Sequence, residues 1–405
     1  MMMQPPSIRR IFIIAGITSL FISYLGIWMR LINNPVERTG SDFIHFYSAG
    51  RIAQNKGVAH VYDLALQHEM EEEQVGFPLA EEQVLPYNHL PFLIPILQVT
   101  VSADYVSSFY RWVLIMLIIY VSSITVLGST LKQTGMDRGS ILIVAAGALL
   151  FLPVFFSLMN GQDTAILLLG ASIWMYGLIS DREWTAGLGL SLTTVRPHIA
   201  LILALPMLFR YRKIFLGFLL GSGALALFSF SILGIEGTRE FINILFISAG
   251  GEWYGIKQYA MFNLIGLLMR MVPWLEAATI RTFGWIIYGI TILSLVFLWA
   301  RSRHLRDSLI GLTVTLALFV VPHLHFHDLT LLLIPIYAFI RSSTQSAIIT
   351  RSVATVLPIV ISLLLLISNA SPYLQYTIPY LNMLALAGYP YYLEHKMTLI
   401  LPHQS

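Results

Sequence analysis

Long runs of apolar residues separated by short polar segments dominate the pattern along the chain. The first run, Ile11 to Trp28, follows Arg9 and Arg10 and has no small-residue cleavage site, which indicates an uncleaved span rather than a signal peptide. Further runs suited to crossing a hydrocarbon core of about 30 Å follow it. They lie at 106–130, 139–158, 163–180, 214–234, 282–300, 307–322, 328–341, 347–368 and 376–393. The pattern predicts an all-α polytopic membrane protein of about 10 to 12 transmembrane helices, forming a single membrane domain over 1–405.

Two shorter apolar segments do not fit a simple span. Between Trp184 and Phe209, two short runs are separated by Arg196-Pro197-His198, which predicts a helical hairpin that enters and leaves on one side. The segment 91–101 is too short to cross comfortably and contains two prolines. We expect it to be re-entrant or interfacial.

Two polar loops are long, 31–105 and 235–281, and both are predicted on the extracytoplasmic side. With the N-terminus in the cytoplasm, roughly fourteen Lys and Arg residues fall inside and nine outside, as the positive-inside rule favours. The first loop contains an acidic stretch from Glu69 to Glu82, which is expected to form a solvated helix. Soluble chemistry therefore belongs to the outer face.

Composition supports a membrane protein and narrows its chemistry. Only 11% of the residues are charged, against about 25% in soluble domains, and the mean hydropathy is +0.74. The net charge is +3 and the basic residues stand singly, which argues against nucleic acid as a partner. The absence of cysteine excludes disulfides, cysteine-ligated metals and thiol catalysis. The chain contains neither a P-loop nor a nucleophile elbow, so nothing supports ATP-driven transport or serine hydrolysis.

Polar residues at the membrane edge are the functional candidates, because each costs free energy unless it is paired or hydrated. Asp42 and His45 follow the first span and share one face if their segment is helical. Asn160-Gly161-Gln162-Asp163 forms a tight turn in which Asp163 is a candidate N-cap. Arg196 at the hairpin tip requires an acid, a water-filled cavity or an anionic ligand. Each cluster also has an explanation without function. The first would be interfacial aromatics around a solvated acid, the second a capped turn and the third a structural ion pair.

A fourth cluster, Pro322 to Asp328, contains His323, His325 and His327. Three histidines invite a metal, but on one helix only the first and third share a face. Hydrogen bonding to an anion is the favoured interpretation, and a purely structural set of interfacial histidines is the alternative.

These clusters occur in an order that resembles the membrane glycosyltransferases of the GT-C fold, in particular glycosyltransferase family 87 (GT87). Asp42-Phe43 through Tyr47 resembles its Asp-Phe and Tyr element, and Val61-Tyr62-Asp63 resembles its Leu-Tyr-Asp. The run from Tyr87 to Phe92 is similar to its Tyr-x-Pro-Pro, from which Asn88 and His89 depart.

The resemblance continues through the second half of the chain. Gly161-Gln162 is similar to the Gly-Gln turn, and Arg196-Pro197 to a hairpin tip that usually reads Lys-Pro. Asn263 is similar to the Asn of the second outer loop, and Pro322 to Asp328 to the Pro, aromatic and His element.

The resemblance implies an inverting transfer of a sugar, mannose in the first instance, from a polyprenyl-phosphate carrier to an acceptor hydroxyl of a glycan or glycolipid. Asp42 would be the general base, and Arg196 with His198 or His327 would stabilise the leaving phosphate. No metal or other cofactor is expected. A bacterial inner membrane, with an extracytoplasmic active site, is the implied location. The substrate-binding candidates are His45, Tyr47, Asp63, Asn88, His89, Gln162, Asp163, Arg196, His198, Asn263, His325 and His327.

Two other classes remain open from the sequence. A secondary transporter would share the spans and buried charges, but should show repeated halves, and no internal symmetry is apparent. A non-enzymatic lipid-binding or assembly protein would tolerate loss of Asp42.

Overall fold

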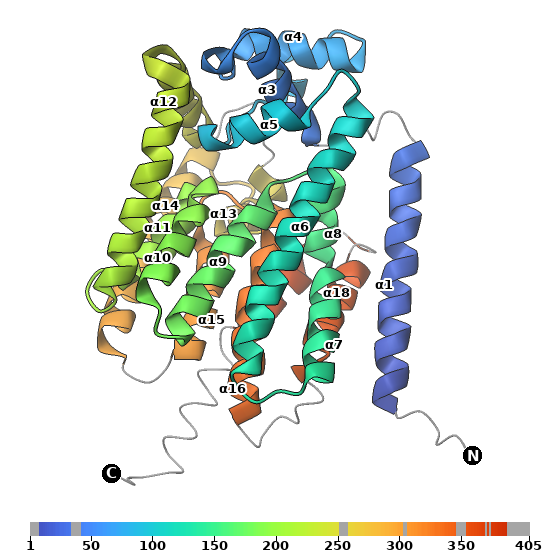
Figure 1. The fold of residues 1–405 in the computed structure, drawn as a ribbon, viewed down its shortest axis with the longest axis vertical. Helices are drawn as coiled ribbons and strands as arrows, with labels where there is room; N and C mark the ends of the chain where they lie inside the picture. Colours follow the sequence, from blue (N-terminus) through green and yellow to red (C-terminus); the bar gives the residue numbers. More distant parts are fainter. Residues whose placement is uncertain are drawn as a thin grey trace.

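The computed structural model describes residues 8–33, 42–250, 258–302, 306–345, 354–368, 371 and 374–386. All regular structure in these ranges is helical, which confirms the all-α prediction (Figure 1). The predicted loop segments 34–41 and 251–257 lie outside the described residues.

Four described helices are long and apolar enough to cross a membrane: α1 (Ile8–Asn33), α6 (Tyr105–Lys132), α12 (Arg212–Gly250) and α14 (Ala277–Arg301). A fifth span results if the bent pair α7 (Arg138–Leu149) and α8 (Leu152–Asn160) is counted as one. Shorter helices overlap other predicted spans. They are α9 (Thr164–Ile179), α15 (Arg306–Val320), α16 (Leu333–Gln345) and α18 (Leu357–Ser368). The chain is thus a polytopic membrane protein, and the total of about 10 to 12 spans stays a prediction.

The run predicted at 139–158 is broken in the structure. Helix α7 (Arg138–Leu149) and helix α8 (Leu152–Asn160) meet at an angle of 44°. Pro153 lies in the first turn of α8, where its missing N–H and fixed φ suit a helix start but not a continuous helix. The break directs α8 into the turn that carries Asp163.

Short helices of the first polar loop lie across one end of the bundle (Figure 1). They are α3 (Phe43–Asn55), η1 (Val58–His60), α4 (Leu64–Val75), η3 (Pro91–Leu93) and α5 (Ile94–Thr100). The upper part of α12 reaches the same end, where Gly237 lies against the backbone of Ala59. The two long polar loops therefore meet at one face, and α5 lies transversely there rather than continuing α6.

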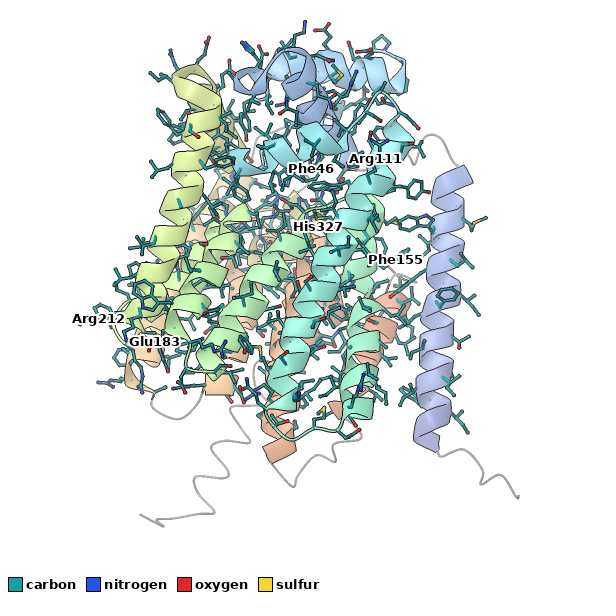
Figure 2. All side chains as sticks on the ribbon, in the orientation of Figure 1. Phe46, Arg111, Phe155, Glu183, Arg212 and His327 are labelled. Carbon is teal, nitrogen blue, oxygen red and sulfur yellow. The ribbon has the colours of Figure 1, made fainter. Side chains whose placement is uncertain are left out.

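The opposite end of the bundle gathers basic residues that were predicted together on the inner side. Arg306 forms an ion pair of 2.7 Å with Asp181, and Arg210 donates a hydrogen bond to the Ser302 carbonyl oxygen. Figure 2 places Glu183 and Arg212 at this same end. Arg212 thus lies at the end away from the two polar loops, and which end faces the cytoplasm stays a prediction.

Helix α4 is confirmed as a helix, but it is not fully solvated as expected. Gln67 and Glu71 are buried, with exposed fractions of 0% and 1%. Glu71 accepts a hydrogen bond from the Leu85 N–H. Burial raises the pKa of Glu71 from 4.5 to about 8. The acidic composition concealed this inward face because exposed glutamates, including Glu69 and Glu73, surround it.

This raised pKa predicts a stability that falls as the pH rises. Between pH 4.5 and about 8 the folded protein keeps the Glu71 proton while the unfolded chain loses it, so the free energy of unfolding decreases by up to about 1.4 kcal/mol per pH unit. Glu71→Gln removes this titration. The melting temperature of Glu71→Gln in detergent, measured relative to that of wild type, should therefore rise from pH 5 to pH 8. Glu69→Gln is the exposed control, and a difference independent of pH would contradict the assignment.

Candidate active site

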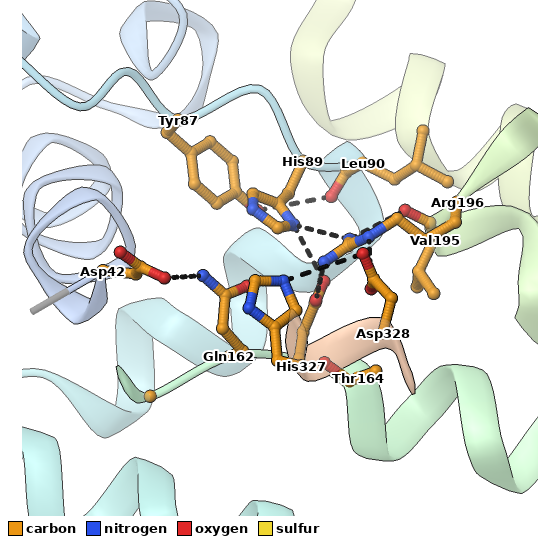
Figure 3. A network of polar contacts seen from close by, with 12 residues as sticks. Asp42, Tyr87, His89, Leu90, Gln162, Thr164, Val195, Arg196, His327 and Asp328 are labelled. Atoms are coloured by element: carbon orange, nitrogen blue, oxygen red, sulfur yellow. Dashed lines mark hydrogen bonds and ion pairs between the residues drawn. The ribbon is translucent and has the colours of Figure 1, made fainter. Parts of the chain in front are cut away.

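A buried network of ion pairs lies between the outer helices and the bundle (Figure 3). One carboxylate oxygen of Asp163 lies 3.0 Å from the Arg196 guanidinium, and the other lies 2.8 Å from His89 Nδ1. Arg196 also pairs with Asp328 at 3.4 Å. Because a carboxylate only accepts, Nδ1 of His89 carries the proton, and its 3.3 Å approach to Arg196 is a contact rather than a hydrogen bond. One cation is thus shared by two buried carboxylates.

The turn between α8 and α9 delivers Asp163 to this network. Gly161 has a φ of 72°, a left-handed conformation that ends α8, and its carbonyl oxygen accepts a hydrogen bond from the buried Trp112 indole. Asp163 occupies the predicted N-cap position of α9, but its side chain makes no capping hydrogen bond. The carboxylate faces His89 and Arg196 instead, so capping does not account for this residue.

Arg196 lies at the tip of the predicted helical hairpin. Helix α10 (Glu183–Ser191) and helix η4 (Leu192–Val195) lead to it, and α11 (Pro197–Ala204) leads away. Glu183 and Arg212, at the two bases of the hairpin, lie at one end of the molecule (Figure 2). Entry and exit on one side are thereby confirmed. Of the three predicted kinds of partner, the structure provides acids.

Glycine contacts fix the depth of this hairpin. Helix α10 packs between α9 and α12. A Cβ on Gly187 would lie 2.8 Å from Gly217 Cα and would collide with the Ile214 carbonyl oxygen. Both neighbours are backbone atoms of α12, which cannot move independently of their helix. The approach of the two backbones therefore sets the height at which Arg196 meets Asp163.

We expect Gly187→Ala to destabilise the protein by about 1–3 kcal/mol, the usual range for overpacking. The sugar transfer that the resemblance implies should fall in the folded fraction as well, because α10 must move and carries Arg196 with it. The measurements are thermal unfolding in detergent and specific activity. Gly223→Ala on α12 is the matched control, since a Cβ there meets nothing within 4 Å. Equal behaviour of the two variants would show that the hairpin contact is not limiting.

Asp42 lies beside the network, at the start of α3. Its carboxylate accepts a hydrogen bond of 2.6 Å from the Gln162 side chain (Figure 3). Gln162 directly precedes Asp163, so the turn links the candidate base to the ion pairs. His45, one turn further along α3, stacks on His89 with ring centroids 5.0 Å apart. Asp42 itself is half-buried, whereas His45 is buried.

The histidines of the fourth cluster do not lie on one helix. His323 and His325 precede η7 (Phe326–Leu332), and the successive ring centroids of His323, His325 and His327 are 4.5 and 5.4 Å apart. Burial lowers the pKa of His325 and lowers that of His327 to about 4, so both rings are neutral at pH 7. Within the described ranges, no three His, Asp or Glu side chains are grouped as metal ligands.

Several predicted binding residues make other contacts and do not join the network. The Asp63 carboxylate caps α4, and the Tyr47 hydroxyl donates to the Ala103 carbonyl oxygen. Asn88 donates to Ser248. Asn263 caps α13 (Leu264–Met271) and donates to the Val321 carbonyl oxygen, so both atoms of its amide are engaged. The His198 ring lies 6.4 Å from that of His323. These residues remain candidates by resemblance.

The sequence-based set omitted Asp328, which the structure places at the centre. It is 1% exposed, pairs with Arg196 and accepts the His325 backbone N–H. A usable signal existed, because this carboxylate directly precedes an apolar run and has no Lys or Arg nearby in sequence. Gln67 and Tyr62 were also missed as polar contacts, and no periodic pattern marks them.

Fold and site together define a helical membrane protein with a buried polar centre beneath one face. Comparison with known families finds glycosyltransferase family 87 over residues 90–324, more than half of the chain. The chain belongs to this family, and the protein is a membrane-embedded glycosyltransferase. The match includes Asp163 and Arg196 but begins after Asp42 and His89 and ends before Asp328. No curated protein matches the chain.

Proposed function

We propose that this glycosyltransferase moves a sugar, mannose in the first instance, from a polyprenyl-phosphate carrier to an acceptor hydroxyl. The observation that carries the proposal is the half-buried Asp42 carboxylate, joined through Gln162 to the buried network of Arg196. The candidate base then lies on one side of this turn, and the polar, charged region for the leaving group lies on the other. The acceptor is a glycan or glycolipid at the extracytoplasmic face.

The reaction requires one base and one place for the departing charge. The acceptor oxygen attacks the anomeric carbon as its proton passes to Asp42. The bond from the anomeric carbon to the phosphate oxygen breaks, and the electron pair leaves with the phosphate. Attack opposite the leaving group inverts the anomeric configuration.

Charge balance favours the histidines as the groups that respond to the donor. Asp163 and Asp328 share Arg196 as their common cation, while the rings of His325 and His327 are neutral. A bound phosphate beside His325 and His327 would raise their pKa, because a nearby anion favours the charged imidazole. Protonation of these rings on donor binding would then supply the positive charge that Arg196 already shares with two acids.

The assignment of the outer face rests on the separation of charge between the two ends. Both polar loops meet at the end that holds α3 to α5, and Arg212 lies at the other (Figures 1 and 2). By the positive-inside rule the basic end is cytoplasmic. A lipid-linked donor would then approach the site from the membrane and the acceptor from the extracytoplasmic side.

A donor assay tests this function. Purified protein in lipid vesicles receives radiolabelled mannose either on a polyprenyl monophosphate or on a nucleoside diphosphate, together with a membrane extract as the source of acceptor. We expect label transfer from the lipid donor alone, and NMR of the product should show an inverted anomeric centre. Transfer from the nucleotide sugar alone, or retention of configuration, would refute the proposal.

A further inference from the structure

The segment 84–90 has no regular secondary structure, yet its backbone is held at three alternate residues by side chains. Leu85 N–H donates to Glu71 Oε2 at 3.0 Å, and Tyr87 N–H donates to Gln67 Oε1 at 2.7 Å. The Tyr62 hydroxyl donates to the His89 carbonyl oxygen at 2.6 Å. Alternate residues of an extended segment present their groups in a similar direction, so three anchors on one side can hold it as a neighbouring strand would.

The anchors are built into the outer helices. Gln67 and Glu71 lie four residues apart on α4 and therefore share a face, which is buried against the segment. Gln67 also donates to the Val61 carbonyl oxygen at 2.7 Å, so both atoms of its amide are used. Tyr62 is 1% exposed and precedes α4. The arrangement costs conformational freedom in three side chains, which a loop with no positional role would not require.

The anchored segment ends at His89, whose ring enters the Arg196 network. The ring is 2.8 Å from Asp163, stacks on His45 and lies 4.5 Å from the Phe46 ring, measured between centroids. His89 thus connects the outer helices to the carboxylate that pairs with Arg196. A shift of the segment would withdraw its hydrogen bond from Asp163 and change how Asp163 shares Arg196 with Asp328.

We propose that Tyr62, Gln67 and Glu71 are positioning residues for sugar transfer, which hold residues 85–89 so that His89 stays against Asp163 and Arg196. The inference rests on the proposed function, because it assumes that the Arg196 network receives the donor phosphate. None of the three residues touches the reacting atoms. They act through the backbone of the segment and through His89.

A double-mutant cycle tests whether the anchors act through His89. Gln67→Leu removes both hydrogen bonds of the anchor, and we expect kcat/KM for the donor to fall about tenfold, as for the loss of a buried hydrogen-bonding group. In a His89→Ala background the same change should have no further effect, because the residue being positioned is gone. Multiplicative losses in the double variant would overturn the proposal.

Conservative variants separate positioning from folding. Glu71→Gln keeps an oxygen that accepts the Leu85 N–H, so its activity at pH 7 should stay within about twofold of wild type, whereas Glu71→Leu should lose about tenfold. Tyr62→Phe removes a single hydroxyl and serves if Gln67→Leu does not fold. Glu69→Gln, on the exposed face of α4, is the control. Equal activity in Glu71→Leu and Glu69→Gln would also overturn the proposal.

A measurement without substrate distinguishes failure of the inference from failure of the proposed function. Amide hydrogen exchange at Leu85 and Tyr87 should rise in Gln67→Leu and stay unchanged in Glu69→Gln. If exchange rises but wild-type protein transfers nothing from the lipid donor, the proposed function fails and the anchoring stands. If the wild type is active and exchange does not change, the anchoring fails.

Discussion

Asp42→Asn is expected to lower sugar transfer by at least about a hundredfold, the low end for the loss of a general base. Asparagine has the shape of aspartate, and its oxygen can still accept the Gln162 hydrogen bond, so α3 and the turn at Asp163 should keep their places. It cannot take the proton of the acceptor hydroxyl. Binding of the lipid donor should therefore persist while the chemical step is lost.

The measurement is single-turnover transfer by purified variant, with donor binding measured separately. Asp104→Asn is the matched control, because that exposed carboxylate caps α6 and lies outside the proposed site. A near wild-type rate in a well-folded Asp42→Asn preparation would mean that the base is Asp63 or Asp163 rather than Asp42. Asp163 already pairs with Arg196, which would lower its basicity.

Arg196→Ala should have the second large effect, and this effect should include folding. The substitution leaves Asp163 and Asp328 buried without their shared cation, and breaking a buried ion pair in this way costs about 3–5 kcal/mol. Turnover should be almost lost. Arg196→Lys should retain part of both properties, because one ammonium keeps the charge but lacks the planar fork that reaches two acids. Folded yield in detergent and specific activity are measured together.

A compensated variant separates the two roles of Arg196. Arg196→Met combined with Asp163→Asn and Asp328→Asn removes the buried charges together, so folded yield should recover relative to Arg196→Ala. Transfer should remain lost if the guanidinium also contacts the donor phosphate. Recovery of both properties would make Arg196 a purely structural cation. Arg212→Ala, at the exposed base of the hairpin, is the control for loss of a surface arginine.

The all-helical membrane fold could be predicted from the sequence because its cause is local. A helix in lipid must satisfy its backbone within one segment, so each span leaves a continuous apolar run. The hairpin at Arg196 was visible for the same reason, as two runs too short to cross and separated by charge. The break between α7 and α8 was missed, since Pro153 interrupts a run that stays apolar throughout.

The sequence by itself determined the order of the polar clusters and their position at the ends of apolar runs. Only the tertiary structure decided that Asp163 is shared between His89 and Arg196, that Asp328 completes the pair, and that Gln67 and Glu71 face inward. These contacts join residues from separate helices, and the hydrophobic periodicity of the sequence does not indicate which buried charges pair. A charge in a low-dielectric interior requires a partner, so the sequence shows that a partner must exist. The packing of α9, α10 and η7 decides which residue is that partner.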